Sequence, residues 1–134
     1  MSESEFEAMF LSFQLRATMS YMRATKLLLR LPLPISLEPF SPEMTPTELV
    51  DNMKIGHRAV KDLPMPRFLR VAVSTALLDW MSGVALAAVA ATEEEIWTIE
   101  AALVAVGRAN VELELAEGLL DGDIDEDDIE IVDE

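Results

Sequence analysis

The chain of 134 residues contains no cysteine and a single histidine, His57. The absence of cysteine excludes disulfides, thiol nucleophiles and thiolate metal sites. The five glycines, at positions 56, 83, 107, 118 and 122, form neither a P-loop nor a dinucleotide fingerprint. His57 falls at the border between two faces of a predicted helix, where a boundary residue is expected. We therefore expect a non-enzyme with no catalytic, cofactor-binding or metal-ligating residue.

Lysine and arginine are nearly absent from the second half of the chain. Residues 1–70 hold nine basic and eight acidic residues, whereas residues 71–134 hold one basic and seventeen acidic residues. Binding to phosphates needs clustered cations, so we expect no direct contact with nucleic acid. A basic protein partner, or the basic half of the chain itself, is expected to face these acids, and mimicry of nucleic acid is a special case of this expectation.

The first ten residues include three glutamates and no cation, which is unlike a secretory or mitochondrial leader. Together with the absence of cysteine, this predicts a cytoplasmic protein. A hydrophobic content of 51% is ample for one core in a chain of this length. We expect a single helical domain over residues 1–121 and an acidic flexible tail over residues 122–134.

Helix signals divide the chain into four segments. Thr45-Pro-Thr-Glu48 combines an N-cap, a proline in the first turn and a capping-box acid, and Thr92 with Glu95 forms a second capping box. Five of the seven prolines fall in residues 32–46 and predict an extended connector. The predicted helices cover residues 4–31, 46–63, 66–91 and 93–120. The predicted fold class is all-α, a four-helix bundle-like domain with long antiparallel helices.

The helix predicted over 4–31 has two apolar stripes and therefore needs two neighbours. The second stripe consists of Leu11, Leu15, Met22 and Leu29. The helix predicted over 93–120 is also apolar on two sides, and Gly107 within it is expected to allow close helix packing. These surplus faces predict self-association, most simply as a two-fold homodimer or otherwise as a higher oligomer.

Three further groups of residues are predicted to mediate interactions. The basic seam of the first helix consists of Arg16, Arg23, Lys26 and Arg30, and a second basic row consists of Lys54, Arg58 and Lys61. In the tail, the apolar residues are Ile129, Ile131 and Val132. Residues 129–132, with acids on both sides, resemble a SUMO-interacting motif, and the resemblance implies a short strand that adds to the edge of a sheet.

The segment 66–91 is long and apolar enough for a membrane-associated helix to be an alternative. Asp79 lies near its centre, where a charge costs about 2.5 to 3.5 kcal/mol on membrane insertion scales, so we consider the membrane unlikely. In an antiparallel hairpin that turns at Thr92, Asp79 lies roughly one turn from Arg108. We therefore predict that Asp79 and Arg108 form a buried ion pair.

The enzyme alternative depends on carboxylates. Glu114, Glu117 and Asp121 share a helix face, and Glu48 with Asp51 offers a second pair. The pattern resembles the paired ExxE and ExxD motifs of all-α NTP pyrophosphohydrolases, in reversed order, and implies a metal-dependent phosphohydrolase. The leading interpretation is a non-enzymatic protein-interaction module, that is, a small acidic regulator, inhibitor or assembly factor.

Overall fold

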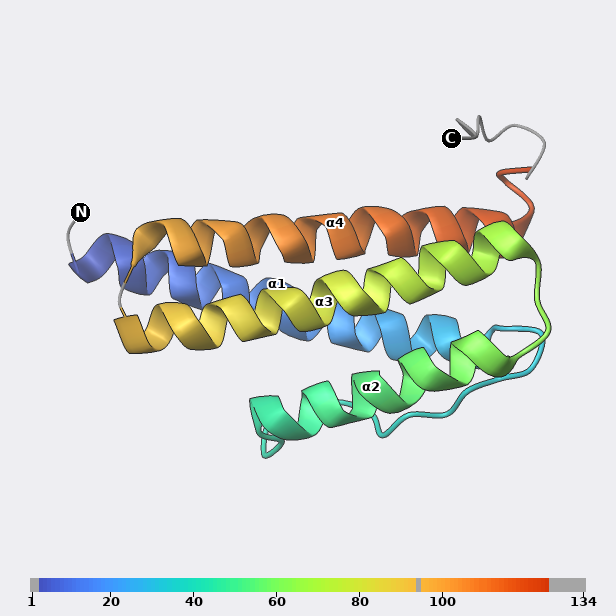
Figure 1. Cartoon of the computed structure of the whole chain (residues 1–134), viewed down its shortest axis with the longest axis horizontal. Coiled ribbons are helices and arrows are strands. Elements are labelled where there is room, and N and C mark those ends of the chain that lie inside the picture. Colours follow the sequence, from blue (N-terminus) through green and yellow to red (C-terminus); the bar gives the residue numbers. More distant parts are fainter. Residues whose placement is uncertain (1–2, 94, 126–134) are drawn as a thin grey trace.

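The computed structural model describes residues 3–93 and 95–125. These residues form four α-helices and no strand, so the prediction of an all-α fold is confirmed (Figure 1). The helices are α1 (Glu3–Leu29), α2 (Pro46–Asp62), α3 (Arg67–Glu93) and α4 (Ile96–Asp121). Most of the predicted tail, with Ile129, Ile131 and Val132, lies outside the described residues.

The helices α3 and α4 form an antiparallel hairpin, which is the most extensive contact between helices in the described structure. The helix α1 runs beside α4 in the same direction and also packs against α3, while α2 packs against α3 (Figure 1). Alanines supply much of the contact surface of the hairpin, including Ala72, Ala76, Ala102 and Ala109. Small side chains at the contact let the two helix axes approach closely.

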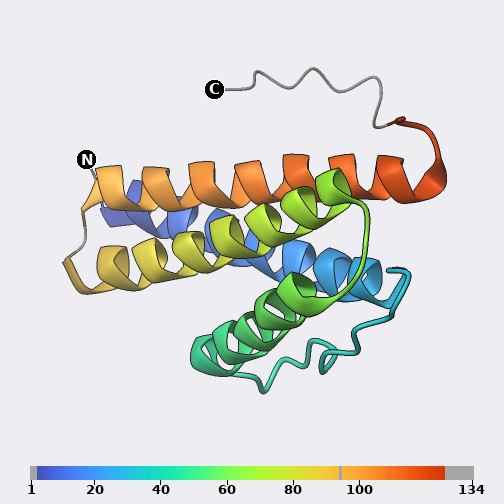
Figure 2. The ribbon, with the colours of Figure 1, turned by 45° about the vertical axis from the view of Figure 1, so that its right-hand side comes forward.

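Residues 30–45 connect α1 to α2 without a helix, and they double back along α2 (Figure 2). Within this connector Ile35 and Leu37 are buried, and Phe40 packs against the core. The Tyr21 hydroxyl donates to the Glu38 carbonyl at 2.7 Å and accepts a hydrogen bond from Asn52 at 3.1 Å. These two bonds fasten both the connector and α2 to α1.

Trp80 of α3 is buried where α1 and α3 pack together. Its indole Nε1 donates to the Ala17 carbonyl at 2.9 Å, and its ring lies 5.7 Å from the ring of Tyr21. One buried cluster joins all four helices and the connector. A second cluster, which includes Phe13, Ala87 and Ile99, joins α1, α3 and α4 without any residue of α2.

The helix α2 begins as the sequence predicts, because the Thr45 side chain accepts the Glu48 N–H and Pro46 is the first helical residue. The helix α4 ends at Gly122, which has a φ of 78° and donates its N–H to the Gly118 carbonyl. The helix α1 begins at Glu3, one residue before the predicted start, and ends at Leu29, two residues before the predicted end.

The predicted capping box at Thr92 is also wrong. The helix α3 continues to Glu93, and the Thr92 hydroxyl donates to the Ala88 carbonyl four residues earlier at 3.1 Å. The N-cap residue of α4 is instead Glu95, which makes no side-chain capping bond. A threonine hydroxyl can bond within its own helix or cap the next one, and here the bond within α3 is formed.

The close approach between helices occurs at Gly83 of α3 and not at the predicted Gly107. A Cβ atom on Gly83 would lie 2.8 Å from Val106 Cγ2 and 3.2 Å from the Ala102 carbonyl oxygen. A Cβ atom on Gly107 would meet nothing within 4 Å. By length and composition α3 is also a candidate membrane span, although 39% of its most apolar window is buried inside the protein.

Candidate functional site

The second apolar stripe of α1 is uncovered in the described structure. Leu11, Leu15, Met22 and Leu29 are all exposed, with 62% of Leu15 accessible, and Met19 joins them. Trp97, Val104 and Val111 form a parallel exposed row on α4, at spacings of seven residues. By helical spacing the α1 row points away from α3, while the α4 row reaches the edge between α4 and α3, because Val111 lines a hollow there with Thr75 and Asp79 of α3. We call these eight residues the outer face.

Charges of opposite sign border the two halves of the outer face. On α1, Arg16 and Lys26 line a surface hollow together with Met19 and Met22. On α4, Glu100 and Glu114 are exposed and lie within four residues of Val104 and Val111. None of these four charged side chains forms an ion pair within the part of the chain that the structure describes. Two halves with opposite charges can pair with each other across a contact between copies.

The basic seam of α1 is divided by the fold. Arg23 forms an ion pair with Glu117 of α4, and Arg30 forms one with Asp121. Between the same two helices, the Ser20 hydroxyl donates to the Asn110 side-chain oxygen at 2.9 Å. Half of the predicted seam therefore joins α1 to α4, and only Arg16 and Lys26 are left for a partner. The second basic row, Lys54, Arg58 and Lys61, is exposed along α2.

Two of the three α4 carboxylates that suggested a metal site also join α1 to α4. Glu117 and Asp121 face arginines of α1 rather than a common point, and Glu114 is exposed. Glu48 and Asp51 are exposed on α2. Within residues 3–93 and 95–125, no group of three or more histidine, aspartate or glutamate side chains is placed to hold a metal ion.

A carboxyl pair lies in a shallow hollow between α3 and α4. Asp79 of α3 and Glu112 of α4 line it together with Thr75, Arg108 and Val111. Burial, a hydrogen bond with Asp79 and the charge of Asp79 raise the pKa of Glu112 to about 8, while the charge of Arg108 opposes this rise. Oε1 of Glu112 is shielded from solvent and has no hydrogen-bond donor among the described residues.

The predicted buried pair between Asp79 and Arg108 is corrected by this geometry. Arg108 is exposed, and the neighbour that shares a hydrogen bond with Asp79 is Glu112. The physical reason is the position of the turn, because α3 runs to Glu93 and α4 begins at Ile96. Because the turn comes later in the sequence than predicted, the α4 residue that lies opposite Asp79 is about one helical turn further along α4.

His57 connects α2 to α3 and is half-buried. Its Nε2 lies 3.1 Å from the Ser74 hydroxyl. Burial and then the charge of Lys61 lower the pKa of His57, so the imidazole is neutral at pH 7. This contact fits the expected boundary residue.

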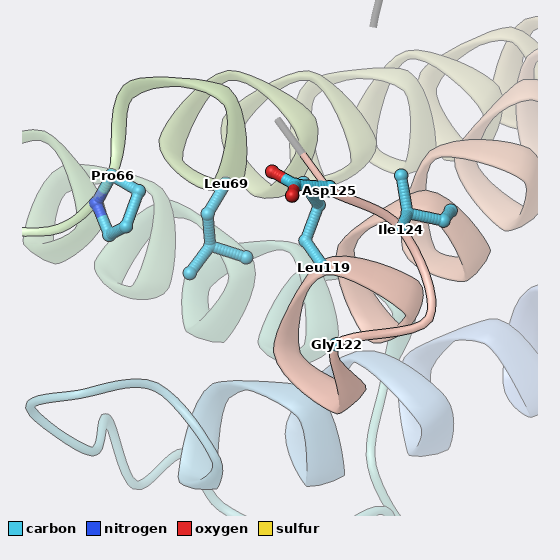
Figure 3. Close-up of a pocket in the computed structure, with 6 residues that line it drawn as sticks. All are labelled: Pro66, Leu69, Leu119, Gly122, Ile124 and Asp125. Atoms are coloured by element: carbon cyan, nitrogen blue, oxygen red, sulfur yellow. The ribbon is translucent and has the colours of Figure 1, made fainter. Parts of the chain in front are cut away.

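A more apolar hollow lies beside the start of α2. It has a volume of about 460 Å³ and opens between α1, α3 and the start of α2. We call it the α1–α3 groove; its lining includes Phe10, Phe13, Phe40, Trp80, Ala88 and Ala91. A smaller hollow at the opposite end, between Pro66, Leu69, Leu119 and Ile124, is shown in Figure 3.

Sequence reasoning missed both the α1–α3 groove and Glu112. The groove had a readable signal, because the predicted second helix is much shorter than the other three and cannot cover all of their length. Glu112 had no signal in the sequence, because its contact with Asp79 depends on the register of the α3–α4 hairpin. Comparison of the chain with protein-family models, with curated proteins and with solved structures finds no match.

Proposed function

We propose that the protein is a non-enzymatic interaction module that self-associates through its outer face, most simply as a two-fold homodimer. The observation that carries this proposal is the outer face itself, eight large apolar side chains exposed along two neighbouring helices. Exposed apolar patches of this extent are characteristic of contact surfaces. The four helices then form a bundle-like unit whose uncovered side is covered by a second copy.

The size of the outer face supports this proposal. A helix of 27 residues is about 40 Å long, and two neighbouring helices are about 20 Å wide, which gives a footprint of about 800 Å². A stable interface covers about 800 Å² on each partner. The outer face is therefore large enough for a dimer without a contribution from α2.

The charges indicate how two copies would pair. A two-fold axis parallel to the helices places α1 of one copy on α4 of the other. Such an axis preserves the position along the helices, so Lys26 lies nearly level with Glu114 of the second copy, and this pair of charges occurs twice. Such pairs are exposed at the rim, so they select the orientation more than they add to affinity.

Variants that introduce a carboxylate test this proposal. We expect Leu15→Glu and Val104→Glu each to reduce the mass of the particle to that of a single chain, because they bury a carboxylate at the contact. Ile55→Glu is the matched control, since Ile55 is exposed on α2, away from the outer face. Sedimentation velocity gives the mass; identical behaviour of all three variants would contradict the proposal.

Membrane association is a second candidate function because α3 is long and apolar enough to span a bilayer. Three exposed apolar residues of α3, Val71, Leu78 and Val89, lie on its solvent side. Flotation with neutral phosphatidylcholine vesicles separates the two candidates. The interaction module stays with the soluble fraction, whereas a membrane protein floats.

The charge distribution supports a basic protein partner, and we propose a cytoplasmic setting for the interaction. Residues 122–134 supply an acidic tail in this proposal. Deletion of these residues should leave the helix content unchanged and weaken binding of a cationic protein, most clearly at low salt, because exposed charges are screened over about 8 to 10 Å. Circular dichroism and a salt titration of binding measure the two effects; loss of folding would place the deleted residues in the core instead.

A further inference from the structure

The α1–α3 groove lies at the position of a missing stretch of helix. The helices α1 and α3 each have 27 residues, and α2 has 17. At 1.5 Å per residue α2 is about 15 Å shorter than its neighbours. Figure 1 shows α3 extending beyond the start of α2 towards the α3–α4 turn. The second core cluster contains no residue of α2, so α1 and α3 present an open groove there.

The floor of the groove suits the apolar side of a helix. Phe10 and Phe13 of α1 face Val84 and Ala87 of α3 across it, and Phe40 of the connector closes one side. The small residues Ala87, Ala88 and Ala91 allow a helix axis to come close. An amphipathic helix of about ten residues would fill the uncovered 15 Å, which is the geometry of helix-in-groove recognition.

The rim of the groove is acidic. Glu3 and Glu7 lie seven and three residues before the groove residue Phe10, respectively, and so share its side of α1. Glu43 and Glu48 adjoin the groove residues Met44 and Leu49, and all four glutamates are exposed. The first cation along α1 is Arg16, which lines the hollow on the α4 side, and the first along α2 is Lys54.

We propose that the α1–α3 groove binds an amphipathic helix of a partner protein, with apolar residues on one side and lysine or arginine on its flanks. The apolar floor holds the apolar side, and the glutamates of the rim pair with the flanking cations. This inference rests on the proposed role as an interaction protein and names the chemistry of the partner. It does not require self-association, because the groove and the outer face are different surfaces.

A designed peptide tests the groove directly. The probe is a 14-residue peptide, acetylated and amidated, with leucines at i, i+3, i+7 and i+10 and lysine or alanine elsewhere. One control peptide has the same composition scrambled so that its leucines share no face, and another has glutamate in place of lysine. Calorimetry measures binding, and Trp80 fluorescence in a Trp97→Phe protein reports on the groove, since the chain has two tryptophans.

Matched variants locate the binding. Ala88 and Ala85 are both exposed on α3, but only Ala88 lines the groove. We expect Ala88→Phe to weaken binding of the lysine peptide at least about tenfold and Ala85→Phe to change it by less than about twofold. Glu7→Gln with Glu48→Gln should weaken binding about threefold or more at low salt, while Glu100→Gln with Glu114→Gln on α4 should not.

The outcomes separate the two proposals. Absence of binding, equal binding of the scrambled or glutamate peptides, or equal binding to Ala88→Phe would overturn the groove proposal. A change in particle mass caused by Ala88→Phe would overturn it too, because the occupant would then be a second copy of this chain. Binding with the expected pattern to a protein that is monomeric by sedimentation would support the groove and reject self-association.

Discussion

At the scale of single residues, Glu112 is the most perturbed titratable group of the described structure. Its carboxyl is held between α3 and α4 beside Asp79, and the pKa of Glu112 is raised to about 8 from a reference value of 4.5. A carboxyl with a raised pKa keeps its proton in the folded state over a pH range in which the unfolded chain has lost it. The sequence alone does not place Asp79 and Glu112 together, because their contact depends on where the hairpin turns.

The pH dependence of stability follows from this difference. The contribution of Glu112 is fully present below about pH 4.5 and is lost as pH rises through about 8, because the folded state binds more protons in that window. We expect Glu112→Gln to raise the free energy of unfolding by about 1 to 2 kcal/mol at pH 8.5 and far less at pH 5, a discounted value because the group is partly solvated. Urea unfolding at both pH values measures the difference.

A pH-independent effect of Glu112→Gln would show that the carboxyl is solvated. Arg108→Ala is a useful companion, because the exposed Arg108 opposes the rise of the pKa. It should cost less than about 1 kcal/mol, since the side chain is not part of a buried pair.

Gly83 and Gly107 form a second test at this scale. A methyl group on Gly83 meets Val106 and the backbone of Ala102, whereas one on Gly107 meets nothing. We expect Gly83→Ala to cost about 1 to 2 kcal/mol through overpacking and Gly107→Ala to add up to about 1 kcal/mol through helix propensity. Thermal unfolding at one protein concentration compares the two; equal effects would contradict the described contact between α3 and α4.

At the scale of elements, the sequence predicts the helices well and their ends unevenly. The connector and α2 are marked by proline and by a local cap, and these signals act within four residues. The start of α4 is different, because Thr92 had two possible partners and only the folded hairpin selects one. The same displacement of the turn explains why Arg108 was paired with Asp79 in the prediction.

The two threonines give a direct comparison of a real and a false cap. Thr45→Ala removes the acceptor of the Glu48 N–H, so we expect a loss of about 1 kcal/mol. Thr92→Ala removes only a bond to the Ala88 carbonyl within α3 and should change stability by less than about 0.5 kcal/mol. Urea midpoints measure both; a larger loss for Thr92→Ala would restore the predicted capping box.

At the scale of the whole molecule, charge is arranged differently in space and in sequence. By sequence the first half is nearly neutral and the second half acidic. In the fold, the start of α1, the start of α2 and the α3–α4 turn lie towards one end, and their charged residues are mostly glutamates (Figure 1). The cations Lys61, Arg67 and Arg70 lie near the α2–α3 connection at the other end, where α2 also ends with Asp62 and α4 with Asp121. The first end is therefore acidic and the other end carries both signs, which supports a basic partner at the acidic end.

The outer face is the part of the site that the sequence predicted most fully. Leu11, Leu15, Met22 and Leu29 were named from periodicity alone, and the structure leaves them exposed. The α1–α3 groove could not be derived in the same way, because it arises from three helices and a connector that are far apart in sequence. Self-association itself stays a prediction that a measurement of the particle mass in solution will test.

The most direct measurement is the mass of the wild-type particle by light scattering coupled to size exclusion, over a dilution series in the micromolar range. One chain has a mass of 14.9 kDa. We predict about twice that mass, or a larger whole multiple, falling towards one chain only on strong dilution, as mass action requires. A mass near 14.9 kDa at every concentration would contradict the proposal that a second copy covers the outer face.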